Sequence, residues 1–314
     1  MSNFIISLDF EMFWGVVDSK TINNYSNNIL GVKCSLPKTL TLFREYHINA
    51  TWATVGMLMC NNFNEWVDYK PSELPNYTRS SCSTYGVPDC FIKESPDLFF
   101  APDLVNLILD TEGQELASHT YSHFFCGEQG ASVEAFKVDC QIQRDVFSKY
   151  DLTPESIVFP RNQVTDEYVQ AASEFGLKTF RGNSQHWVYK KGHFVPYGGL
   201  GKVIRKLDSY IPLTGFNNFV TNTTTYPINV PASLFFRPSA SYLLDTLQIM
   251  RIKRSMLAAA KTGKNFHLWW HPHNFGVNIE SNLYNLEEVL KFYKKLEHEY
   301  GMQSKSMKDV ANEE

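Results

Sequence analysis

The sequence has no excess of either charge, because 29 lysines and arginines stand against 33 aspartates and glutamates. The formal net charge of −4 argues against a partner held by nucleic-acid phosphates, since such proteins carry a basic excess. Long apolar runs are missing too, and none reaches the roughly 20 residues that a membrane-spanning helix needs. We therefore expect no nucleic-acid partner and no membrane span.

None of the six cysteines forms a CxxC pair, so a zinc site built from cysteines is not expected. Six cysteines are ordinary for a reduced protein of this length, although Cys82 and Cys90 could close a small loop in an oxidising compartment. The first residues contain no basic segment, and Asp9 and Glu11 interrupt the first apolar run. We therefore expect no secretory signal and predict a cytoplasmic protein.

Aromatic residues are abundant: 23 Phe, 16 Tyr and 6 Trp make up 14% of the chain. Large aromatic side chains fill protein cores, and flat aromatic faces also pack on sugar rings. We expect most of them in the core, and composition alone does not separate a core from a carbohydrate site.

Apolar runs of strand length alternate with amphipathic runs of helix length along most of the chain. Strands are predicted at 4–8, 48–55, 114–117, 156–159, 177–181 and 266–270. Helices are predicted at 36–46, 103–110, 132–150, 165–175, 244–261 and 286–300. These repeated strand–helix units predict one parallel α/β domain over residues 1–314, built as a barrel or as an open sheet.

Three segments depart from this alternation. Residues 61–100 contain four prolines and two cysteines with little periodicity, which predicts an insertion or long loop. Residues 185–240 are less regular and rich in Gly, Pro and aromatics. We expect these two segments to shape the substrate cleft, and residues 303–314 to form a polar tail.

Asp9 and Glu11 follow directly on the first apolar run. Because residues i and i+2 of a strand share a face, both carboxylates would point the same way at the strand's carboxyl end, where parallel α/β folds place active sites. Two crowded carboxylates repel each other unless a cation or a proton lies between them. The pattern is equally typical of a solvated strand end.

His119 and His123 follow the strand predicted at 114–117. Two histidines four residues apart share a face of a helical turn and can bind one ion. With one carboxylate and a position left for water, they would form a typical catalytic zinc set. Two unrelated surface or core histidines would give the same pattern.

The strand predicted at 266–270 is followed by His271 and His273. Imidazoles at a strand end are suited to proton donation near neutral pH. A core strand with flanking polar residues is the alternative, and it fits His267 better than His271.

Arg161 follows the strand predicted at 156–159. An arginine at this point could pair with a buried carboxylate and hold it ionised and oriented. A surface arginine at the start of a loop is the commoner case for a single arginine.

Taken in order, these motifs resemble those of the NodB-homology polysaccharide deacetylases (carbohydrate esterase family 4), which include chitin and peptidoglycan N-deacetylases. The matching segments are Ser7-Leu8-Asp9-Phe10-Glu11, Ala50-Thr51-Trp52-Ala53-Thr54-Val55-Gly56, Glu115-Leu116-Ala117-Ser118-His119-Thr120-Tyr121-Ser122-His123, Phe159-Pro160-Arg161, Phe180-Arg181-Gly182 and Leu268-Trp269-Trp270-His271. The third segment is almost the complete second motif of the family and is the most specific. The resemblance spans residues 4–275.

Two motifs depart from the family's pattern. The first lacks adjacent aspartates, so Glu11 would replace an aspartate at position 10 as the ligand. After Arg161, the usual proline–aromatic–glycine is replaced by Asn162, Gln163 and Val164, which leaves the orientation of the arginine open.

The resemblance implies a distorted (β/α) barrel, often with seven parallel strands. It also implies metal-dependent removal of an acetyl group from an N-acetylated sugar of a surface polysaccharide or its precursor. Glu11, His119 and His123 would hold a divalent cation, for which Zn²⁺ is expected. Asp9 would be the general base, held ionised by Arg161.

The same resemblance assigns the remaining site residues. His271 would protonate the departing amine, and His273 is the second candidate for this role. Trp269, Trp270, His273 and Arg181 are expected to bind the substrate.

Two other functions stay open at this stage. Related folds hydrolyse small amides and ureides, as cofactor-independent allantoinases do. A catalytically degenerate member would bind a saccharide or a nucleotide sugar, or act as an assembly partner. The sequence fixes neither the sugar, nor the native metal, nor the oligomeric state.

Overall fold

The structure is a computed structural model that describes residues 2–184, 186, 188–189 and 198–312. Part of the segment 185–240, for which the sequence predicts little regularity, lies outside these described residues. Among them, no helix combines the length and apolar composition needed to cross a membrane.

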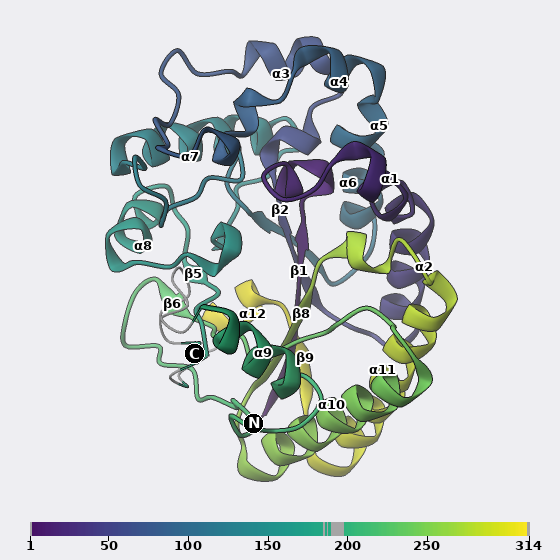
Figure 1. Ribbon diagram of the computed structural model, residues 1–314. Coiled ribbons are helices and arrows are strands. Elements are labelled where there is room, and N and C mark those ends of the chain that lie inside the picture. Colours follow the sequence, from purple (N-terminus) through teal and green to yellow (C-terminus); the bar gives the residue numbers. More distant parts are fainter. Residues whose placement is uncertain (1, 185, 187, 190–197, 313–314) are drawn as a thin grey trace.

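Parallel strands form one curled sheet with helices packed around it (Figure 1). The strands are β1 (Asn3–Phe10), β2 (Ala50–Thr54), β3 (Gln114–Ser118), β4 (Ser156–Ile157), β5 (Thr179–Phe180), β6 (Ile228–Asn229), β7 (Leu234–Phe235), β8 (Phe266–Trp270) and β9 (Gln303–Lys305). Their order is β6-β5-β4-β3-β2-β1-β8-β7, and β9 also pairs with β1. Every pair of these strands is parallel.

This arrangement confirms the predicted distorted (β/α) barrel, built as a single domain. Within the described residues the main path has eight strands where the resemblance implied seven. Two of them, β6 and β7, are two residues long and come from the segment 185–240. β4 and β5 are equally short but lie within the regular strand–helix alternation, whereas β6 and β7 lie in a segment without it, so the sequence did not reveal them.

Helices fill the connections between the strands. The longer ones are α1 (Ile22–Leu30), α2 (Val32–Glu45), α6 (Pro102–Leu109), α7 (Val133–Ser148), α8 (Asp166–Ser173), α9 (Gly198–Asp208), α10 (Tyr242–Thr262) and α11 (Ile279–Tyr300). All six predicted helices and all six predicted strands are present, although α2 and α11 begin earlier than expected. The sequence periodicity therefore located the repeating units and placed some of their ends wrongly.

The segment 61–100 packs on the turn that follows the first strand. It contains α3 (Phe63–Asp68), α4 (Asp89–Glu94), α5 (Pro96–Phe99) and two short 3-10 turns, η3 (Ser80–Cys82) and η4 (Thr84–Gly86). The buried Trp66 ring stacks on Trp14, with ring centres 5.8 Å apart, and the Trp14 indole N–H donates to the Phe99 carbonyl at 2.8 Å. Trp14 belongs to η1 (Met12–Val16), so this segment holds the turn directly after Glu11.

The C-terminal segment is part of the core, and the prediction of a polar tail is wrong for residues 303–312. It forms β9 and α12 (Met307–Ala311), and the side chains of Met307 and Val310 are fully buried. The backbone N–H of Lys308 donates to the buried Glu115 carboxylate of β3 at 3.0 Å. Figure 1 shows α12 in yellow among the strands, and it contacts β2, β5 and β9. Only two of its apolar side chains, Met307 and Val310, are fully buried, and this short pattern did not reveal the helix in the sequence.

Candidate active site

The carboxyl end of β1 carries both predicted carboxylates. Asp9 lies in β1, Glu11 follows it directly, and each is only 3% exposed. Strand alternation gives Ser7, Asp9 and Glu11 a common face. The two acids are therefore buried beside each other, which excludes the alternative of a solvated strand end.

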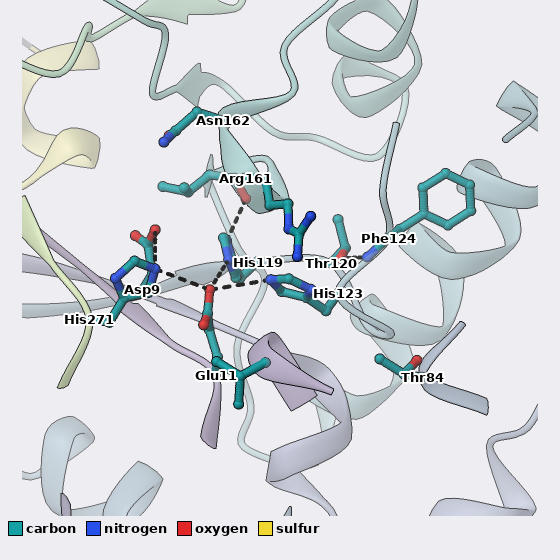
Figure 2. A network of polar contacts seen from close by, with 12 residues as sticks. Asp9, Glu11, Thr84, His119, Thr120, His123, Phe124, Arg161, Asn162 and His271 are labelled. Atoms are coloured by element: carbon teal, nitrogen blue, oxygen red, sulfur yellow. Dashed lines mark hydrogen bonds and ion pairs between the residues drawn. The ribbon is translucent and has the colours of Figure 1, made fainter. Parts of the chain in front are cut away.

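Three imidazoles surround the Glu11 carboxylate, as Figure 2 shows. Its Oε1 lies 3.0 Å from His119 Nε2, 3.2 Å from His123 Nε2 and 3.6 Å from His271 Nε2. His119 and His123 are buried, whereas the His271 side chain is 24% exposed. The structure thus brings together the three predicted metal ligands, with His271 beside them.

The donor set fits a divalent cation. Ligand atoms at 2.0–2.2 Å from a tetrahedral zinc lie roughly 3.3 Å apart, close to the separations between Glu11 and the two buried histidines. His119 Nδ1 donates to the Val158 carbonyl at 2.7 Å, so in neutral His119 the lone pair of Nε2 faces Glu11. Two imidazoles and one carboxylate form one group of possible metal ligands in the structure.

The charge of the Glu11 carboxyl is stabilised by its neighbours. Burial alone would raise its pKa, but the nearby His271, His123 and His119 hold the pKa well below its usual range. Burial lowers the pKa of His123. An ionised carboxylate beside a neutral imidazole is the state in which both bind a metal.

Residues 119–123 form a loop, and the predicted helical turn is wrong. Thr120 and His123 have positive φ angles of 62° and 55°, which no right-handed helix contains. The Phe124 N–H donates to Thr120 Oγ1 at 2.7 Å. The two imidazoles still meet, with ring centres 5.2 Å apart, because the loop folds back on itself.

Asp139 of α7 holds this loop in place through hydrogen bonds. The sequence analysis did not identify Asp139 as a residue of the site. Its carboxylate accepts hydrogen bonds from the N–H groups of Tyr121, at 2.6 Å, and Ser122, at 3.0 Å, and from the Ser122 hydroxyl. Burial raises the pKa of Asp139 to about 6. Its place on the buried stripe of α7, between Phe136 and Gln143, was the signal available in the sequence.

Replacing Asp139 by alanine is expected to destabilise the fold and the metal site together. Each of the two buried N–H groups left without an acceptor costs about 1–3 kcal/mol, so we expect the free energy of unfolding to fall by roughly 2–6 kcal/mol. Urea denaturation measures this change, and a chelator competition measures the metal affinity. Asp145→Ala, at an exposed position of the same helix, is the control. Equal unfolding midpoints for the two variants would show that Asp139 does not hold the loop.

Asp9 is held by Arg181, not by Arg161. Arg181 Nη1 and Nη2 donate to the two carboxylate oxygens of Asp9 at 2.6 and 2.7 Å, a bidentate pair between two buried side chains. Burial alone would raise the pKa of Asp9, but Arg181 and His119 bring it below its usual value. Asp9 is therefore ionised and fixed in orientation.

Further contacts keep Arg181 in place beneath the site. Nη1 donates to Ser7 Oγ at 2.9 Å, Nη2 donates to Asn162 Oδ1 at 2.9 Å, and the guanidinium lies 4.2 Å from the centre of a Trp269 ring. His267 Nε2 lies 2.8 Å from the same serine hydroxyl. Arg181 is fully buried and offers no exposed surface to a substrate, and its bidentate contact is with Asp9.

Arg161 turns away from Asp9, which corrects the predicted pairing (Figure 2). Its φ angle is 54°, it forms an ion pair with Asp18, and its guanidinium lies 4.8 Å from the Phe125 ring centre. Asn162 also has a positive φ, of 53°. These two left-handed residues direct the arginine outward and the Asn162 amide toward Arg181.

A cavity of about 460 Å³ opens over the carboxylates and imidazoles. The lining residues include Asp9, Glu11, Trp269, His271 and His273. This is the space in which a substrate would meet the predicted base, acid and metal ligands.

The residues around β8 divide between this cavity and the core. Trp269 lines the cavity, whereas Trp270, which was also expected to bind substrate, is 1% exposed, packs on Phe236 and does not line the cavity. His273 stacks on His271 with ring centres 4.9 Å apart. Burial and the nearby His271 lower the pKa of His273 to about 3, so at neutral pH His273 is a neutral imidazole and not the imidazolium that a general acid requires.

Gly15 makes room for the Glu11 carboxylate. A Cβ atom at this position would lie 1.9 Å from Glu11 Oε2. Gly15→Ala is therefore expected to displace the carboxylate and weaken metal binding by about 10- to 100-fold, the range seen when the surroundings of a ligand are altered. Chelator competition measures the affinity. The control is Gly86→Ala, whose Cβ would meet its nearest neighbour at 3.9 Å; equal affinities for both variants would contradict this role.

Comparison with known proteins places the chain in a family. Residues 25–180 match the family described as polysaccharide deacetylase. The chain therefore belongs to the polysaccharide deacetylase family. The matched region contains His119 and His123 but neither the β1 carboxylates nor His271, so the completion of the site rests on the geometry above. No curated protein matches the sequence.

Solved structures share the fold at low sequence identity. A candidate polysaccharide deacetylase from Mycobacterium smegmatis has a TM-score of 0.63 and 11% identity, and the match covers 99% of this chain and 89% of that one. A candidate polysaccharide deacetylase from Pseudomonas aeruginosa PAO1 has a TM-score of 0.61 and 9% identity, with the same coverage. The PuuE allantoinase has a TM-score of 0.59 and 11% identity, again with 99% and 89% covered.

Proposed function

We propose that this protein is a metal-dependent hydrolase that removes the acetyl group from an N-acetylated sugar. The observation that carries the proposal is the convergence of Glu11, His119 and His123 beside Asp9, in a cavity that His271 also lines. Family membership supports an amide substrate on a carbohydrate. We also propose Zn²⁺ as the native cation and keep the cytoplasm as the predicted location.

Glu11, His119 and His123 would hold the cation. Bound there, a divalent cation supplies Lewis-acid activation of a water molecule and of the acetyl carbonyl. The three side chains are fixed before any cation binds: the Val158 carbonyl orients His119, and the loop that carries His123 is anchored by Asp139. This preorganisation favours a single geometry at the centre.

Asp9 is the general base of the proposed reaction. It lines the cavity, and the bidentate pair with Arg181 keeps it ionised and oriented. An ionised carboxylate in hydrogen-bond reach of the attacking water accepts its proton as the new carbon–oxygen bond forms. Arg181 is a positioning residue, because it lies beneath the cavity and touches Asp9 alone of the reacting groups.

His271 is the general acid. Its Nε2 lies 3.8 Å from Asp9 Oδ2 and 3.6 Å from Glu11 Oε1, and its side chain reaches the cavity. An imidazolium at this position donates a proton to the sugar nitrogen as the carbon–nitrogen bond breaks, so that a neutral amine departs. His273, with a pKa of about 3, is the weaker candidate.

Acetate release tests the proposal. The purified full-length protein is incubated with N-acetylated mono- and oligosaccharides, with and without a chelator, and acetate is quantified enzymatically. We expect release from at least one N-acetylated sugar, loss with the chelator and recovery with Zn²⁺. Hydrolysis of allantoin alone would favour an allantoinase-like enzyme, and bound metal without any amide hydrolysis would favour a saccharide-binding protein.

A further inference from the structure

A second cavity of about 330 Å³ adjoins the proposed active site. Both cavities are lined by the same set of residues where they meet: Arg161, Asn162, Phe235, Arg237, Trp269 and His271. A group bound in the second cavity would therefore lie next to a sugar whose acetyl group is above Glu11 and Asp9.

The second cavity is strongly positive. Arg161, Arg205 and Arg237 line it, and none of its described lining residues is Asp or Glu. Arg161 is balanced by Asp18, so the uncompensated charge comes from Arg205 and Arg237. We call this cavity the arginine pocket.

Arg237 is the best-positioned cation of the arginine pocket. It lies two residues after the end of β7, is half-buried, and lines both cavities. Its Nε donates to Ser209 Oγ at 2.8 Å, and its guanidinium lies 5.6 Å from the centre of the Phe235 ring. Among the described residues no carboxylate lies within ion-pair distance of it, as the recorded ion pairs show.

An unpaired, partly buried guanidinium has lost part of its hydration without gaining a counter-charge. Burial accordingly lowers the pKa of Arg237. Its anchored Nε leaves the two terminal nitrogens of the planar fork for a ligand, and that fork matches the oxygens of a phosphate or a carboxylate. An anion in the arginine pocket would supply the missing partner.

We propose that the arginine pocket binds an anionic group, a phosphate or a carboxylate, carried by the sugar that is deacetylated. The assignment of this group to the substrate rests on the proposed function. The presence of an anion site does not, because it depends on Arg237 and its surroundings alone. The substrate class is thus an acidic N-acetylated sugar, not a neutral one.

Binding of inorganic phosphate tests the site. The metal-loaded full-length protein is titrated calorimetrically and compared with Arg237→Gln and with Arg254→Gln, a control that removes the same charge from an exposed position of α10. Loss of a charge-assisted contact predicts a Kd about 10- to 100-fold higher in Arg237→Gln. The control is expected to stay within about twofold of wild type. An unchanged Kd in Arg237→Gln, as for phosphate bound only to the cation, would overturn the proposal.

Deacetylation kinetics identify the anion. N-acetylglucosamine 1- and 6-phosphate, an N-acetylated hexosaminuronic acid and a neutral methyl glycoside are compared as substrates. We expect Arg237→Gln to lower the ratio of kcat/KM for the preferred acidic sugar over the neutral one by at least about tenfold. Preference for the sugar phosphates would identify the anion as a phosphate, and preference for the uronic acid would identify it as a carboxylate. A kcat/KM ratio unchanged by the mutation would overturn the proposal that the substrate carries the anion.

The two tests separate failure of the proposal from failure of the proposed function. Weaker phosphate binding in Arg237→Gln without acetate release from any sugar would retain the anion site and remove the deacetylase. Acetate release, together with phosphate binding that Arg237→Gln leaves unchanged, would retain the deacetylase and remove the anion site.

Discussion

The His119→Ala and His123→Ala variants are expected to lose the bound cation and acetate release together while the fold is kept. Each substitution removes one of the three proposed ligands, Glu11, His119 and His123. Altering only the surroundings of a ligand weakens binding by about 10- to 100-fold, so removing a ligand should weaken it by more than about 100-fold. Metal content of the purified variants, measured by plasma mass spectrometry, is the readout.

A histidine outside the site serves as the control, because its replacement shows whether loss of metal and activity is specific to His119 and His123. His298, exposed near the end of α11, is the control, and His298→Ala should keep both metal and activity. Far-UV circular dichroism verifies that all three variants are folded. Full metal content in either His119→Ala or His123→Ala would show that the ligand assignment is wrong.

Asp9→Asn is expected to retain the cation and to lose about two to four orders of magnitude in kcat, the usual contribution of a general base. Asp9 is not one of the proposed ligands Glu11, His119 and His123, so metal content should match the wild type. With Glu11 and His271, however, Asp9 forms a second group of possible ligands, and the experiment distinguishes the two. The amide oxygen can still accept one hydrogen bond from Arg181, whereas the amide nitrogen cannot accept the second. Single-turnover acetate release and metal analysis on the same sample measure both effects.

The outcome distinguishes a base from a ligand. Loss of the metal in Asp9→Asn would place Asp9 in the coordination shell, and near wild-type kcat would exclude it as the base. Asp97→Asn, a surface carboxylate that pairs with Lys33, is the control and should change neither quantity.

The sequence was sufficient to predict those site residues that lie at the carboxyl ends of strands. Asp9 lies near the end of β1, Glu11 follows β1, and His271 follows β8. Because β1 and β8 are neighbours in the sheet, the meeting of these residues follows from parallel pairing. His119 follows β3, two strands away from β1. For these residues, the order of the chain and the period of its apolar runs were enough.

The choice between two arginines depended on backbone detail that the sequence does not carry. Arg161 and Arg181 both follow strands, β4 and β5, and either could reach Asp9 by that criterion. The positive φ angles at Arg161 and Asn162 decide between them, because they turn the first arginine outward. Arginine has no preference for a positive φ angle, so nothing in the sequence indicated that Arg161 adopts this backbone conformation.

Long-range contacts account for the other misses. The loop at 119–123 is held by Asp139, which lies 16 or more residues away in the chain, and this contact replaces the helical turn that local spacing suggested. In the same way, α12 is stabilised by the backbone N–H of Lys308 on Glu115, a contact between distant segments. Local sequence patterns predict helices and strands, but they do not predict contacts between residues that are far apart in the chain.

Anomalous diffraction at the zinc absorption edge, from crystals of the zinc-loaded protein, tests the central claim most directly. We predict one strong peak within about 2.2 Å of Glu11, His119 Nε2 and His123 Nε2, in the cavity that Asp9 and His271 line. No peak between these three side chains, or a peak bound only by other residues, would contradict the metal centre and the reaction built on it.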